Sequence, residues 1–150
     1  MSLGHVAGRL RTVVGLLFVG LFGFLLEYLG THAKCYAYGE AFPARLFLVP
    51  PVILAMWMLL GFLAWKTYQR WGLLPGLLAP LAVDWAVLEP LAKTFGLWTW
   101  QSTATPRIWF ESTIGNAVVY VWVAGLAIWI LGRLCRESVK VRQTNQPSDN

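Results

Sequence analysis

Charged residues are scarce in this 150-residue chain, where Asp, Glu, Lys and Arg together make up 13%. A soluble domain carries roughly one quarter of its residues as charged types. Apolar types, in contrast, make up 57% of the chain. The shortage of charge excludes an ordinary soluble protein and predicts that lipid is the solvent of most of the chain.

Cysteine and histidine are also rare, with two residues of each. So few residues provide neither a disulfide framework nor the ligand spacing of a zinc site. The chain also lacks a P-loop, a dinucleotide-binding fingerprint and a Ser-His-Asp arrangement. We therefore expect neither a bound metal ion nor a cofactor.

Long apolar runs are what the chain has instead. A helix needs about 20 mostly apolar residues to cross the ~30 Å hydrocarbon layer with its backbone groups satisfied internally. Four stretches meet this requirement: Thr12 to Gly30, Leu46 to Trp65, Gly72 to Ala92 and Ser112 to Gly132. The sequence predicts an all-α, polytopic membrane protein, with one membrane domain over residues 1–136 and a disordered tail over residues 137–150.

The first apolar stretch is interpreted as a spanning helix rather than a cleaved signal peptide. Its apolar run is long for a signal sequence, and it ends in Glu27-Tyr28 instead of small residues. The inner loop from Lys66 to Trp71 is short, so the second and third helices are expected to form an antiparallel hairpin.

The basic residues of the loops predict the orientation of the chain. With four spans, eight basic residues fall on the side of the termini: Arg9, Arg11, Lys66, Arg70, Arg133, Arg136, Lys140 and Arg142. Four fall on the other side: Lys34, Arg45, Lys93 and Arg107. By the positive-inside rule both termini are cytoplasmic, in the cell (inner) membrane. This topology explains the net charge of +5 without a nucleic-acid partner, and it separates Cys35 from Cys135.

A few polar side chains interrupt the predicted spans. An ionisable group near the bilayer centre costs roughly 3 kcal/mol or more, so it marks a functional site by default. Asp84 lies deepest, while Glu27, Glu89 and Asn116 lie nearer the outer ends of their helices. Because the topology brings all four to the outer half of the membrane, we predict that they form one site.

Two interpretations of these carboxyl groups remain open. A carboxyl group removed from water keeps its proton, so it can serve as a buried general acid. Alternatively, each group only hydrogen-bonds a neighbouring helix or reaches the membrane interface. Asp84 and Glu89 are roughly 140° apart around an ideal helix, so they share a face only if the helix is distorted. Pro80 is expected to kink this helix and to open space beside Asp84.

The outer loop between the third and fourth helices holds Trp98, Trp100 and Trp109. Such residues form the aromatic belt at a membrane interface. They also line sites for flat apolar ligands and stabilise cations. The sequence leaves both interpretations open.

Several short motifs occur in a recognisable order along the chain: Glu27-Tyr28-Leu29-Gly30, Tyr36-Ala37-Tyr38, Pro50-Pro51, Asp84 with Leu88-Glu89-Pro90, Gly96-Leu97-Trp98-Thr99-Trp100, Pro106 and Asn116. In this order they resemble the carotenoid biosynthesis membrane proteins. That family includes the bacterioruberin-type carotenoid hydratases and is related to the heterodimeric lycopene cyclases. The resemblance covers about Phe22 to Tyr120.

The resemblance implies an enzyme that acts on a carotenoid or other isoprenoid hydrocarbon without a redox cofactor. In such chemistry an acid protonates a terminal double bond, and water or ring closure quenches the carbocation. Asp84, Glu27 and Glu89 would be the catalytic acid and base. The substrate-binding residues would be Asn116, Tyr36, Tyr38, Trp98 and Trp100, whose aromatic rings stabilise the cation.

The chain departs from that family in two respects. Glu89 stands where the family has the aspartate of an Asp-Pro pair, and four helices are fewer than is common in the family. A homo-oligomer or a partner membrane subunit is therefore expected, in addition to membrane lipid.

Two other classes of function are compatible with the sequence. One is a non-catalytic membrane subunit that binds carotenoid or quinone within a larger complex. The other is a small proton-coupled transporter in which Asp84 relays protons.

Overall fold

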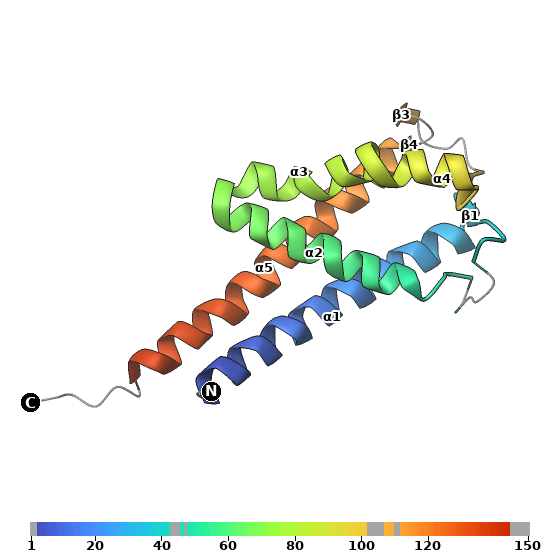
Figure 1. Cartoon of the computed structure of the whole chain (residues 1–150). Coiled ribbons are helices and arrows are strands. Elements are labelled where there is room, and N and C mark those ends of the chain that lie inside the picture. Colours follow the sequence, from blue (N-terminus) through green and yellow to red (C-terminus); the bar gives the residue numbers. More distant parts are fainter. Residues whose placement is uncertain (1–2, 43–45, 47, 102–106, 110–111, 145–150) are drawn as a thin grey trace, which may run out of the picture.

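The computed structural model describes residues 3–42, 46, 48–101, 107–109 and 112–144, and the side chains of residues 8–42, 46, 48–101 and 113–134. Its helices are α1 (Leu3–His32), α2 (Val52–Trp71), α3 (Leu73–Val83), the π-helix η1 (Asp84–Leu88), α4 (Glu89–Phe95) and α5 (Ile114–Thr144). α3, η1 and α4 follow one another without a break and form a single arm (Figure 1).

Four segments are long and apolar enough to cross a membrane: Gly8–His32, Val52–Trp71, Leu73–Phe95 and Ile114–Leu134. The prediction of four apolar spans is thereby confirmed. α1 begins and α5 ends at the same end of the bundle, and the short strands lie at the other end (Figure 1). An even number of spans requires this arrangement.

The second helix differs from the predicted range. It begins at Val52 rather than Leu46, because Leu46 and Val49 pair with each other in a tight turn ahead of Pro50-Pro51. It then continues through the residues predicted to form the inner loop and ends at Trp71. The chain reverses at Gly72, whose φ of 91° is a left-handed conformation that favours glycine.

The last helix also runs further than predicted. α5 ends at Thr144 instead of Gly132, so residues 137–144, predicted as part of a disordered tail, have a helical backbone. This stretch contains Glu, Lys, Arg and Gln, which are strong helix formers in water. Residues 145–150 of the predicted tail lie outside the described residues.

Two short antiparallel sheets were not predicted. β1 (Tyr36–Tyr38) pairs with β2 (Trp98–Trp100), and β3 (Arg107–Trp109) pairs with β4 (Ser112–Thr113). The first sheet joins the loop after α1 directly to the loop after α4. It closes the end of the bundle opposite the termini (Figure 1).

Glycine allows the first two helices to pack closely. A side chain at Gly61 would lie 2.7 Å from Val19, and one at Gly23 would overlap the ring of Trp57. Val19 and Trp57 are fully buried as a result. Small residues at helix contacts are the usual way in which membrane helices approach each other.

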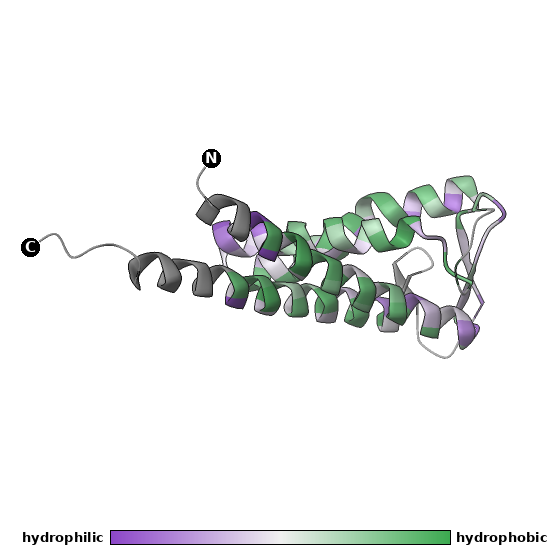
Figure 2. Ribbon diagram, turned by 90° about the horizontal axis from the view of Figure 1, so that it is seen from below, coloured by the Kyte–Doolittle hydropathy of each residue, from purple (hydrophilic) through white to green (hydrophobic). Residues whose placement is uncertain are grey.

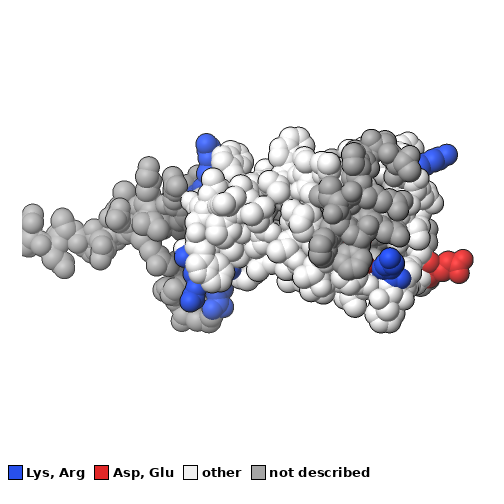
Figure 3. Space-filling model, turned by 90° about the horizontal axis from the view of Figure 1, so that it is seen from above, with Lys and Arg blue, Asp and Glu red and all other residues white. Residues whose placement is uncertain are grey.

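The outer surface of the bundle is apolar. Many large apolar side chains are half exposed or more, among them Phe18, Leu59 and Trp122. Figure 2 shows hydrophobic residues along the helices, and Figure 3 shows Lys, Arg, Asp and Glu of the visible face only towards the two ends. Between the ends lies an uncharged band, as a lipid-facing surface requires.

Candidate functional site

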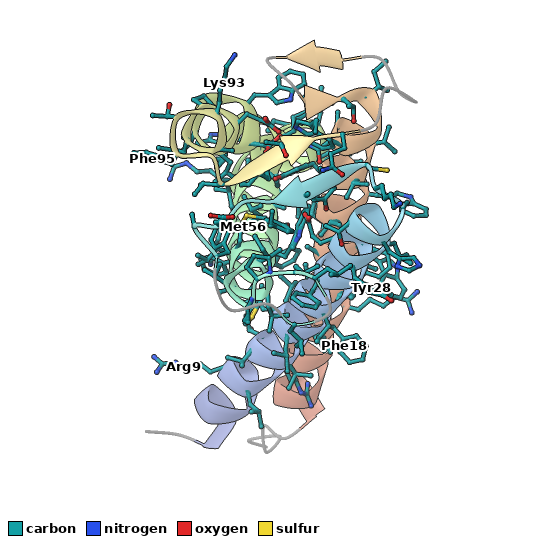
Figure 4. All side chains as sticks on the ribbon, turned by 90° about the vertical axis from the view of Figure 1, so that its right-hand side faces the viewer. Arg9, Phe18, Tyr28, Met56, Lys93 and Phe95 are labelled. Carbon is teal, nitrogen blue, oxygen red and sulfur yellow. The ribbon has the colours of Figure 1, made fainter. Side chains whose placement is uncertain are left out.

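A small polar cavity lies inside the bundle, beneath the sheet formed by β1 and β2. It leaves about 20 Å³ for the centre of a water molecule, enough for about one water molecule. Its lining comprises Glu27, Tyr36, Tyr38, Ile53, Met56, Asp84, Glu89, Trp98, Trp100, Asn116 and Tyr120. Seen from the sheet end, Met56 lies in the interior, while Phe18 and Tyr28 lie on the outer side of the bundle (Figure 4).

All eight residues that the sequence nominated line this one cavity: Glu27, Tyr36, Tyr38, Asp84, Glu89, Trp98, Trp100 and Asn116. They come from α1, both strands of the sheet, η1, α4 and α5. Their convergence follows the topology, which brings the ends of the spans together on one side. Trp109, also considered from the sequence, has no described side chain.

Glu27 of α1 accepts hydrogen bonds from three neutral donors. Tyr36 and Tyr38 donate their hydroxyl groups to Oε2, the latter at 2.6 Å, and Trp57 of α2 donates its indole N–H to Oε1 at 3.1 Å. Both carboxylate oxygens are therefore engaged. Hydrogen bonds to a charged acceptor are stronger than those between neutral groups, so these three donors offset part of the cost of burying a carboxylate.

The pairing of β1 with β2 places four aromatic rings over Glu27. Tyr36 lies opposite Trp100 and Tyr38 lies opposite Trp98. Because side chains alternate along a strand, these four residues share one face of the sheet and Ala37 takes the other. The rings meet edge to face, with centroids 5.0 Å apart for Tyr36 and Trp100 and 6.4 Å for Tyr38 and Trp98.

The phenols of β1 lie outside the membrane-spanning segments. Burial raises the pKa of Tyr36 and of Tyr38 well above the usual value of a phenol, and the negative charge of Glu27 raises both further. Both groups therefore remain protonated donors at any physiological pH.

Asp84 and Glu89 are brought to the same side of their helix by the π-turn. The backbone N–H of Glu89 donates to the carbonyl oxygen of Asp84, the i to i+5 bond that defines a π-helix. Pro80, one turn earlier, has no N–H to donate and is buried within the helix. The two side chains therefore do not have the roughly 140° separation expected for an ideal helix. Both residues are buried, at 1% and 3% exposure, and both line one cavity.

α5 contributes two polar side chains beside Asp84. The amide Nδ2 of Asn116 donates to Oδ2 of Asp84 at 3.2 Å, and Tyr120 is hydrogen-bonded to the same carboxyl group. Thr113 accepts the backbone N–H of Asn116 at 3.2 Å and so caps the start of the helix. Asn116 and Tyr120 are four residues apart and therefore face the same way.

Trp57 and Tyr120 were not nominated from the sequence. Their rings pack against each other at 4.8 Å, and they join the Glu27 cluster to the Asp84 cluster. The spacing of Tyr120 from Asn116 was a usable signal. Trp57 lies in a wholly apolar run with two other large side chains beside it, and nothing in that run distinguishes it.

An apolar cavity of about 240 Å³ adjoins the polar one. Glu27, Tyr36, Trp100 and Asn116 line both cavities and form their common wall. The remaining lining comes from the ends of α1 and α5 and the chain beside them: Leu26, Gly30, Cys35, Thr113, Gly115 and Val119. The site thus combines a water-sized polar space with a larger apolar one.

Known protein families, curated proteins and solved structures offer no match to this chain. The resemblance to carotenoid biosynthesis membrane proteins therefore rests on the short motifs named above. Within the described part of the chain, no group of three or more His, Cys, Asp or Glu side chains is arranged to hold a metal ion. The chemistry available to the site is that of carboxyl, phenol, amide and indole groups.

Proposed function

We propose that the protein is an integral membrane hydratase that adds water to a terminal double bond of an acyclic carotenoid or related isoprenoid hydrocarbon. One observation carries this proposal. A cavity with room for about one water molecule is bounded by carboxyl groups and aromatic rings, and it shares a wall with an apolar cavity large enough for part of a hydrocarbon. Hydration needs an acid, a water molecule and an apolar binding site within one enclosure.

The Asp84–Glu89 pair is the proposed proton donor. Two carboxyl groups that line one small cavity repel each other if both are ionised, so together they hold a proton more readily than one exposed group does. No Lys or Arg lines the described cavity to neutralise them. Transfer of this proton to the less substituted carbon of a terminal double bond leaves a tertiary carbocation on the other carbon.

Aromatic rings and Glu27 would stabilise that carbocation. The faces of Trp and Tyr rings attract cations, and the rings of Tyr36, Tyr38, Trp98 and Trp100 line the cavity. Glu27, held by three donors, is part of the wall shared by the two cavities and would supply a negative charge there.

Water then completes the reaction. Its oxygen bonds to the cationic carbon and it loses one proton to Glu27, which acts as general base. Return of this proton to the Asp84–Glu89 pair restores the enzyme, so the net change is the addition of one water molecule. The indole N–H of Trp100 is buried and has no hydrogen-bond partner among the described residues, which suits it to hold the oxygen of water or product.

Ring closure is the competing outcome of the same carbocation. If a second double bond of the substrate reached the cation before water did, loss of a proton to Glu27 would yield a cyclic product instead. The water-sized space between the carboxyl groups favours hydration.

We place the protein in the cell membrane with both termini in the cytoplasm. Arg9, Lys66, Arg70 and Arg133 lie at the exposed ends of helices on the side of the termini, whereas Lys34 and Lys93 lie on the side of the sheet. This excess of basic residues supports the orientation by the positive-inside rule. A second copy or a partner membrane subunit would cover part of the apolar surface.

A proton-coupled transporter fits the arrangement less well. Such a protein needs polar groups along a path across the membrane. The half of the bundle nearest the termini is filled instead by buried apolar residues such as Ala64, Ala127 and Leu131. Among the described residues, Thr67 is the one buried polar side chain in that half.

Expression in cells that accumulate lycopene tests the proposal. We expect a product heavier than lycopene by one water molecule, and labelled water should place its oxygen in that product. Asp84→Asn and Glu27→Gln should each abolish the product. Glu40→Gln is the matched control, because Glu40 is an exposed carboxyl group that does not line the cavity.

Other results would favour other functions. A cyclic product of unchanged mass would replace hydration by cyclisation. Lycopene that copurifies without reaction would favour the non-catalytic binding subunit. Proton flux in liposomes that depends on Asp84, without any new carotenoid, would favour the transporter.

A further inference from the structure

The apolar cavity lies between α1 and α5 where these two helices part. Near the termini the helices are in close contact, since a side chain at Gly15 would lie 2.8 Å from Leu131 and 2.9 Å from Leu134. Towards the sheet end they separate (Figure 1), and the cavity of about 240 Å³ fills the space between Leu26 and Val119.

The dimensions and lining of this cavity define what it can hold. Its apolar lining greatly exceeds its polar lining, and an apolar cavity of ~150 Å³ accommodates benzene. On that ratio a volume of about 240 Å³ holds about ten carbon atoms. A long polyene therefore cannot be enclosed, and only its end fits.

The neighbouring surface faces lipid. Leu29 on α1 and Val118 on α5 flank the cavity lining and are 50% and 57% exposed. A chain whose end occupies the cavity can therefore pass between the two helices with its remainder in the bilayer.

We infer that this cavity binds the branched, unsaturated end of an isoprenoid chain, which enters from the bilayer between α1 and α5. The inference rests on the proposed function for the identity of the ligand as substrate. The common wall formed by Glu27, Tyr36, Trp100 and Asn116 then brings the terminal double bond against the polar cavity. Val119 sets the depth to which the chain end penetrates.

Binding can be measured without turnover, because Cys35 lines the cavity. In a Cys135→Ser background, Cys35 is the remaining thiol, and its rate of alkylation by N-ethylmaleimide in detergent micelles reports occupancy. Lycopene at ten times its dissociation constant should slow alkylation about tenfold. Hexadecane, which is apolar but unbranched and saturated, should slow it far less.

Substitutions on α5 provide a matched pair. Val119→Phe fills the cavity and should remove the protection by lycopene, whereas Val118→Phe adds the same ring to the lipid-facing side and should preserve it. Leu26→Phe fills the same cavity from α1 and should act like Val119→Phe. Thermal unfolding of each variant in detergent identifies any loss of the fold, and conclusions are drawn from the variants that unfold as the parent does.

The possible results separate this inference from the proposed function. Absence of protection by lycopene, equal protection by hexadecane, or equal effects of Val118→Phe and Val119→Phe would each overturn the binding site. Protection without hydrated product would support the binding site and reject the hydratase. Hydrated product without protection would support the hydratase and reject this cavity as its substrate site.

Discussion

The hydrogen bond from Tyr38 to Glu27 offers a direct measure of the charge at the site. Tyr38→Phe removes only the hydroxyl group, and the ring can keep its contacts with Phe42 and Trp98 at 5.9 and 6.4 Å between centroids. The bond spans 2.6 Å, and Tyr38 is 6% exposed. The change therefore tests the bond rather than the packing.

Two effects determine how much Tyr38→Phe lowers the free energy of unfolding. A hydrogen bond to a charged group contributes about 1.5–3 kcal/mol, and one to a neutral group about 0.5–1.5 kcal/mol. Hydrogen bonds between membrane helices average only about 0.6 kcal/mol, because the unfolded chain in the membrane finds other partners. For a short, buried bond to a carboxylate we expect a loss of about 1.5 kcal/mol, a roughly tenfold change in the unfolding equilibrium.

Equilibrium unfolding in mixed detergent micelles provides the assay. In the Glu27→Gln background the acceptor is neutral, and the cost of Tyr38→Phe should fall to about 0.6 kcal/mol. Tyr68→Phe is the control, since among the described residues the hydroxyl of Tyr68 has no hydrogen-bond partner. If Tyr38→Phe costs no more than Tyr68→Phe, the hydroxyl does not hold Glu27. An equal cost in both Glu27 backgrounds would show that Glu27 is not ionised.

Two further outcomes are expected. Insertion of one alanine after the exposed Ala86 should add about 100° of rotation between Asp84 and Glu89. Product formation should then be lost, while Ala86→Leu retains it. Retention of activity in the insertion variant would refute the pairing of the two carboxyl groups. The contribution of Tyr36 and Tyr38 to the free energy of unfolding should be constant below pH ~10 and fall above it, because the unfolded state ionises its tyrosines there while the raised pKa of both residues keeps them protonated in the fold. Unfolding measured between about pH 8 and 11 in the parent and in the Tyr36→Phe, Tyr38→Phe double variant checks this, and equal slopes would contradict it.

The spans could be predicted because hydrophobicity accumulates over twenty residues, whereas their ends depend on local geometry. Pro50-Pro51 could start a helix or interrupt one, and the structure starts α2 directly after them. The polar residues from Lys66 to Arg70 looked like a loop, yet they continue the helix, because a helix can extend beyond the apolar layer.

The acidic residues of the site could also be predicted from the sequence. Glu27, Asp84 and Glu89 stand out because charge is so costly within an apolar run. Their mutual geometry was not predictable, since a π-turn depends on how the Pro80 arm packs against its neighbours. Trp57 was not predicted as a site residue, because an indole donor in an apolar helix resembles any other large core residue.

The partners of Glu27 and Asp84 come from different parts of the chain, and this has a consequence for biosynthesis. Tyr36, Tyr38 and Trp57 all follow Glu27 within thirty residues, so Glu27 can be satisfied once the second helix has been inserted. Asp84 must wait for Asn116, which lies thirty-two residues later on the last helix. During synthesis into a bilayer, the carboxyl groups of the third helix would therefore stay incompletely satisfied until the final helix completes both the bundle and the site.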